Sequence, residues 1–107
     1  MSNFYCFRQN AVRGTLDFDR VDGLTDFVII EANTAREANA IAESIGIYFD
    51  GVKNELDCPC CGDRWEKVTA LDENPFPCLY DEDITSLVSK SKEDIAIHYK
   101  SGKIEWR

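Results

Sequence analysis

The sequence lacks any long apolar run, and this absence excludes a large class of proteins. No stretch approaches the roughly 20 consecutive apolar residues that a membrane-spanning helix needs, so we expect no membrane contact. The start of the chain has no basic region followed by an apolar run, which predicts that no signal peptide is present. We therefore expect a cytoplasmic protein, in a compartment where thiols stay reduced.

Basic residues are also in short supply. The chain holds 12 Lys and Arg against 20 Asp and Glu, and its formal net charge at pH 7 is −8. Direct nucleic-acid binding by phosphate neutralisation needs clustered Lys and Arg, so the composition argues against it. Most of the acid excess lies in residues 50–83, where ten acids face three basic residues. An acidic surface of this kind favours a partner protein with a basic surface.

Histidine occurs once, as His98, and catalytic motifs are missing. The sequence contains no phosphate loop, no dinucleotide fingerprint and no nucleophile elbow. In the hairpin expected at the C-terminus, His98 lies opposite Glu105 on a half-exposed face. Ser/His/Asp or Cys/His catalysis is then left without a base, so we expect that the protein is not an enzyme.

The length and apolar content predict a single domain over residues 1–107, with one modest core. Residues 27–30 are apolar on both faces of a strand, which predicts a central position in a sheet. Further strands are expected at residues 4–7, 15–19, 47–49 and 65–70.

A helix is predicted over residues 34–45. Thr34 and Glu37 have the spacing of a capping box, and Gly46 stands where a helix C-cap belongs. Small and apolar residues recur at helical spacing at Ala38, Ile41, Ala42 and Ile45. The alanines on this stripe allow the helix to approach a sheet closely.

The rest of the chain completes the predicted fold. A short helix is expected near residues 84–88, followed by a terminal hairpin with a two-residue turn at Ser101 and Gly102. The fold class is α+β: an antiparallel sheet carries one main helix on a face, and a cysteine-knuckle insertion lies beside it.

Three of the five cysteines lie within four positions, in the segment DCPCCGDRW at residues 57–65. Cys58 and Cys61 have the spelling of a zinc knuckle, in which a proline and a glycine let two thiolates converge on one ion. One knuckle supplies two of four ligands. The third is expected from Cys78, which follows in the same sparsely structured stretch, and Cys60 is a further candidate.

Three interpretations of this cluster stay open. A structural zinc site would supply folding energy that a stretch with few core residues lacks. A tight metal-free turn with partly buried thiols is the second interpretation, because four good ligands cannot all be named. A thiol redox site is the third, although no thioredoxin-like order of elements surrounds it.

Three residues that follow the cysteines are candidates for partner binding: Asp63, Arg64 and Trp65. Arg and Trp beside a rigid turn are residue types that often dominate binding energy. The structural alternative is that Trp65 belongs to the core and Arg64 pairs with a neighbouring acid.

Four motifs together resemble a family of small tailed-bacteriophage proteins of uncharacterised function. They are NFYCF at residues 3–7, VIIEA at 28–32, YFDG at 48–51 and DCxCCGDRW at 57–65. The resemblance implies a virus-encoded protein in the host bacterial cytoplasm and carries over no catalytic residue. The function expected is that of a non-enzymatic accessory protein that binds and modulates a host macromolecule. A zinc-dependent nucleic-acid-binding module and a thiol redox protein are the alternatives.

Overall fold

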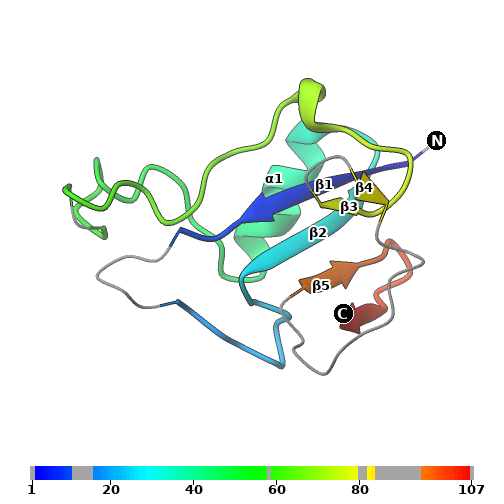
Figure 1. Ribbon diagram of the computed structural model, residues 1–107, viewed down its shortest axis with the longest axis horizontal. Coiled ribbons are helices and arrows are strands. Elements are labelled where there is room, and N and C mark those ends of the chain that lie inside the picture. The colour runs from blue at the N-terminus through cyan, green and yellow to red at the C-terminus, as the bar shows by residue number, and fades with distance from the viewer. Residues whose placement is uncertain (1, 11–15, 58, 80–81, 84–94, 107) are drawn as a thin grey trace.

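A mixed four-stranded sheet forms the centre of the molecule (Figure 1). The computed structural model describes residues 2–10, 16–57, 59–79, 82–83 and 95–106. The sheet contains β1 (Asn3–Arg8), β2 (Phe27–Ala32), β5 (Ile95–His98) and β6 (Ile104–Trp106), in the order β1-β2-β5-β6. As expected for its apolar sequence, β2 is central.

The expectation of an antiparallel sheet is wrong at one pairing. The β1–β2 and β5–β6 pairs are antiparallel, but β2 and β5 run parallel. Parallel neighbours need a long crossover connection, and the chain between β2 and β5 contains the helix α1 (Ala35–Ser44). The α+β class holds, with a mixed sheet.

The predicted helix is confirmed as α1. The Thr34 hydroxyl accepts a hydrogen bond from the Glu37 N–H at 3.1 Å, and the Glu37 carboxylate accepts one from the Asn33 N–H at 3.2 Å. Gly46 ends the helix in the left-handed region at φ 107°, where a glycine avoids the strain of a Cβ atom. Ala38 and Ala42 are fully buried against the sheet, while Ile41 and Ile45 pack at its border.

The main core lies between α1 and one face of the sheet. From the strands come Tyr5, Phe7, Val28, Ile30 and Ala32. Segments without regular structure add Ile47, Phe49, Trp65 and Val68. The strands expected at residues 47–49 and 65–70 do not form. These segments still send apolar side chains into the core.

A second apolar cluster lies on the opposite face of the sheet. Ile29, Ile95 and Ile97 are buried there, with Cys6 and Phe27 packed against them. The short hairpin of β3 (Cys78–Leu79) and β4 (Glu82–Asp83) forms a separate two-stranded sheet. A single turn of 3₁₀ helix, η1 (Ala70–Asp72), precedes it.

Two further sequence expectations fall in the loops. Residues 16–18 form no strand, and Asp19 makes only an isolated bridge with Leu24. The helix expected near residues 84–88 lies outside the described residues. Within the described ranges, no helix has the length and apolar character needed to cross a membrane.

The C-terminal hairpin is confirmed, but its predicted register is wrong by one residue. His98 pairs with Ile104, not with Glu105. Tyr99 donates to the carbonyl of Lys103, which closes a three-residue loop with Gly102 at φ 92°. A one-residue shift moves side chains to the other face of a strand pair. His98 is buried at 9% exposure, where the sequence had predicted a half-exposed side chain.

Candidate functional site

The cysteine loop, residues 50–63, leaves the core after Phe49 and returns to it at Arg64 (green in Figure 1). Its backbone enters the left-handed region at Asp50, Glu55 and Gly62, so it turns sharply at three points. Cys58 lies outside the described residues. The loop extends away from the sheet, and its position depends on contacts at its base.

Asp57 is the anchor at the base of the cysteine loop. Its carboxylate accepts hydrogen bonds from the Arg64 backbone N–H at 2.8 Å and from the Tyr48 hydroxyl at 2.6 Å. The Asp57 backbone N–H donates to the carbonyl of Gly51 at 3.0 Å. Burial raises the pKa of the Tyr48 hydroxyl, and the hydrogen bond to Asp57 raises it further. Both ends of the loop are thereby tied to one buried carboxylate.

The Arg64 guanidinium lies at the centre of the same network, at 8% exposure. Its Nε donates to the Tyr48 hydroxyl at 3.1 Å, and its Nη1 donates to the Gln9 side-chain oxygen at 2.9 Å. An ion pair with Asp17 joins Nε to Oδ2 over 3.5 Å. A buried guanidinium needs such partners, because an unpaired charge in the interior is costly.

Asn10, two residues after the end of β1, ties the far end of the cysteine loop to the sheet. Its side-chain amide donates to the carbonyls of Cys61 at 2.8 Å and Asp63 at 3.3 Å. Its backbone N–H donates to the carbonyl of Arg64 at 2.8 Å. The Asp63 carboxylate accepts from the Val52 N–H at 2.9 Å, across the loop.

Of the two interpretations of Arg64 and Trp65, the structure favours the one in which Trp65 belongs to the core and Arg64 pairs with an acid. Trp65 is at 1% exposure in the main core, and Arg64 is committed to the buried network. Asp63 is partly buried and serves the loop itself. The indole N–H of Trp65 has no hydrogen-bond partner among the described residues. Asp63 and Arg64 therefore hold the loop in place, and Trp65 belongs to the main core.

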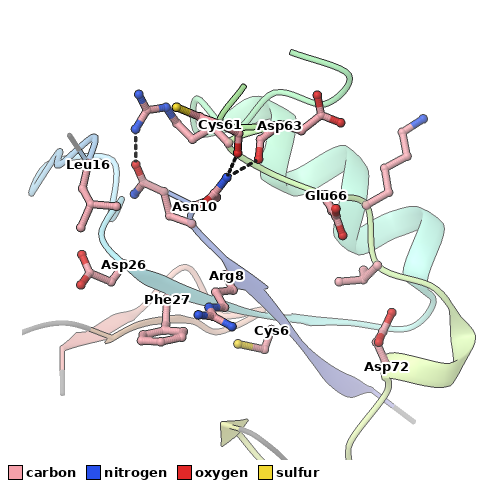
Figure 2. A pocket seen from close by; sticks show the side chains of 15 residues that line it. Cys6, Arg8, Asn10, Leu16, Asp26, Phe27, Cys61, Asp63, Glu66 and Asp72 are labelled. Carbon is pink, nitrogen blue, oxygen red and sulfur yellow. Dashed lines mark hydrogen bonds between the residues drawn. The ribbon is translucent and has the colours of Figure 1, made fainter. Parts of the chain in front are cut away.

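A groove of about 840 Å³ lies beside the cysteine loop, along the outer edge of β1 (Figure 2). One wall is the β1 edge with Cys6, Arg8 and Asn10. The other wall is the segment of residues 64–72, which includes Glu66. Cys61 and Asp63 close one end of the groove, and Asp72 lies at the other (Figure 2).

The predicted metal ligands are only partly brought together. Cys60 is exposed and Cys61 partly exposed on the cysteine loop. Cys78 is buried in β3, at the opposite side of the molecule from the loop in Figure 1. The structure therefore does not bring Cys78 and Cys61 together within one chain. Within the described ranges, no three His, Cys, Asp or Glu side chains form a group that could hold a metal ion.

Two further residues with metal-binding side chains are Cys6 and His98. Burial raises the pKa of the Cys6 thiol to about 12, which disfavours the thiolate in the metal-free protein. The Nε2 of His98 lies 2.9 Å from the carbonyl oxygen of Gly23 and is buried.

Sequence reasoning missed the residues that fix and line the site. Gln9 and Asn10 give no local signal, because their partners Arg64 and Cys61 lie more than 50 positions away. Glu66 and Lys67 belong to no motif, and in the sequence they are only members of the charged stretch at residues 50–83.

A second missed surface lies near β6. The rings of Phe18 and Trp106 are 5.9 Å apart between centroids, and the guanidinium of Arg20 lies 5.2 Å from the Trp106 ring. Phe18 is 59% exposed.

Of the comparisons with known proteins, only the one with family models finds a match. No curated protein and no solved structure matches the chain. The match to a family model carries no statement about a virus or a cysteine motif, so the phage origin stays a prediction. That family model is described as Domain of unknown function (DUF7296), and it matches residues 2–106. The chain therefore belongs to the DUF7296 family.

Proposed function

We propose that this protein is a non-enzymatic binding protein that holds a partner protein in the groove beside the cysteine loop. The observation that carries the proposal is the buried network of Asp57, Arg64 and Tyr48, which fixes the loop against the end of β1. A preformed groove of about 840 Å³ falls in the size range of ligand sites. Preorganisation of this kind lowers the cost of binding.

The charge of the groove supports a basic partner. Four carboxylates line it, from Asp26, Asp63, Glu66 and Asp72. Three basic side chains also line it, so carboxylates exceed basic groups by one. Arg64 is engaged with Asp17 and Gln9, and the carboxylates of Asp63 and Asp72 accept hydrogen bonds from the backbone N–H groups of Val52 and Thr69. The surrounding acidic stretch adds to the negative potential, which steers basic surfaces toward the groove.

We propose further that zinc stiffens the cysteine loop through Cys58 and Cys61. Cys61 lies at the end of the groove, so an ion bound there would order the wall that meets the partner. The third ligand comes from Cys60 or a nearby carboxylate of this chain. A second chain supplies the fourth ligand of the tetrahedral site. Zinc has a structural role in this proposal.

The resemblance to tailed-phage proteins supports a bacterial macromolecule as the partner. A phage accessory protein acts in the host cytoplasm and needs no turnover of its own if it binds stoichiometrically. The burial of His98 against Gly23 supports this assignment, because it removes the most common general base from the surface.

The test is affinity capture from bacterial lysate, followed by titration of the captured partner against two charge reversals. Glu66 is exposed and lines the groove, whereas Glu43 is exposed on α1 and does not. We expect Glu66→Lys to lower the affinity for the partner about tenfold, or about 1.4 kcal/mol. Glu43→Lys should change this affinity less than about twofold. Equal effects of the two variants would remove the groove from the proposal.

A further inference from the structure

The outer edge of β1 is bridged at two points, Phe4 and Asn10, with Cys6 between them. Phe4 exchanges backbone hydrogen bonds with Asn74, at 2.7 and 3.0 Å. Six residues along, the Asn10 N–H donates to the Arg64 carbonyl at 2.8 Å. Phe4 and Asn10 are six positions apart on β1, whereas their partners Asn74 and Arg64 are ten positions apart. The facing segment therefore has four residues more than a continuous strand partner would need.

The extra residues carry this segment away from β1. Trp65 and Val68 turn into the main core, and η1 takes up three further residues. The groove is the space that this detour leaves beside the strand (Figure 2). One wall of the groove is therefore a strand edge.

Cys6 exposes its backbone to this groove. The Gln9 N–H donates to the Asp26 carbonyl, so the odd-numbered residues of β1 direct their N–H and C=O groups toward β2. The even-numbered residues direct theirs outward, as the bridge at Phe4 confirms. Within the part of the chain that the structure describes, neither backbone group of Cys6 has a backbone partner.

We propose that the groove binds its partner as an extended peptide that adds a strand to the open edge of β1. An unpaired N–H and C=O on a strand edge are matched by the backbone of another strand at about 4.8 Å. The bridges at Phe4 and Asn10 limit the added strand to a short segment. Carboxylates along the groove select basic side chains on that segment, and Phe27 and Leu16 offer apolar contacts between them.

This inference rests on the proposed function and names the form of its ligand. The probe is a synthetic heptapeptide alternating Arg and Val, with blocked ends. A second copy carries N-methyl groups on the backbone amides that would pair with β1, and a third replaces Arg with Glu. Amide shifts of isotope-labelled protein are followed by NMR during titration to millimolar peptide.

We expect the Arg/Val peptide to shift the amides of Cys6 and Arg8. The N-methylated and Glu/Val copies should bind at least about tenfold more weakly. Equal binding by the N-methylated copy would overturn strand addition but leave the groove as a side-chain binding site, so the proposed function would survive. No shift at β1 with any peptide would overturn strand addition.

Two measurements on the protein itself complete the test. In the peptide-free protein, the Cys6 amide should exchange with solvent faster than the Tyr5 and Phe7 amides, which face β2. Strong protection of Cys6 would show that the edge is already covered. Cys6→Pro removes the outward N–H while sparing the ladder with β2, so peptide affinity should fall about tenfold. Cys6→Ser is the matched control and should keep that affinity.

Discussion

The carboxylate of Asp57 lies so close to Gly51 that a Cβ atom at Gly51 would stand 1.8 Å from its Oδ2. The carboxylate cannot move aside without losing its hydrogen bonds to Tyr48 and Arg64. Only a glycine at position 51 leaves room for the Asp57 carboxylate to reach Tyr48 and Arg64. These contacts close the base of the cysteine loop.

The first prediction is that Gly51→Ala destabilises the protein by about 3 kcal/mol, because it displaces Asp57 and leaves buried donors without a partner. Urea unfolding measures the change. Gly102→Ala is the control: a Cβ at Gly102 meets nothing within 4 Å, so about 1 kcal/mol of backbone strain is all that it should cost. Equal losses in the two variants would contradict the role given to Asp57.

The second prediction concerns the pH dependence of stability. Burial lowers the pKa of His98 in the folded protein, so the unfolded chain binds the proton first as the pH falls. The contribution of neutral His98 is complete above its unfolded pKa of about 6.5 and is lost as the pH falls toward the lower folded value. Urea midpoints should therefore drop between about pH 7.5 and about pH 5.5, before most carboxylates titrate. His98→Gln should reduce this drop, and an unchanged pH profile would contradict the assignment.

The third prediction is that the purified protein carries zinc and that chelation lowers its melting temperature. Cys61→Ser should lose the metal. Cys78→Ser should keep it, because Cys78 lies in β3 away from the cysteine loop. Metal analysis by mass spectrometry checks both variants. Protein without zinc, or loss of zinc in the Cys78 variant, would contradict this ligand assignment.

The fourth prediction tests α1 as a structural support. Ala42 is fully buried against the sheet, and Ala40 is exposed on the same helix. Ala42→Asp should unfold the domain, because it buries an unpaired charge. Ala40→Asp should cost less than about 1 kcal/mol. Circular dichroism and urea unfolding distinguish the two outcomes, and a folded Ala42→Asp variant would show that the helix packs less tightly than described.

The parts of the fold that follow local rules were predictable from the sequence. The capping residue Thr34, the helical spacing of Ala38 and Ala42, and the doubly apolar β2 all appear where the sequence indicated. The parallel pairing of β2 with β5 was not predictable, because it joins strands that are more than 60 residues apart. The predicted register of the C-terminal hairpin was wrong because Gly102 supports a three-residue loop as well as a two-residue turn.

The candidate site was predicted in location but not in chemistry. The segment DCPCCGDRW was recognised as unusual, and the structure places it at the end of a groove. Its Arg64 and Trp65 have the composition of a binding surface, but Gln9 and Tyr48 hold Arg64 inside the protein and Trp65 lies in the main core. Burial of a charged side chain depends on residues far away in the chain, so a local motif cannot reveal it.

The central claim is that the groove beside the cysteine loop is the partner-binding surface. The most direct measurement is NMR shift mapping of the labelled protein with the captured partner. The account predicts that shifts concentrate on Arg8, Glu66 and Lys67, which line the groove. Shifts that concentrate on Phe18 and Trp106, the aromatic pair near β6, would contradict it.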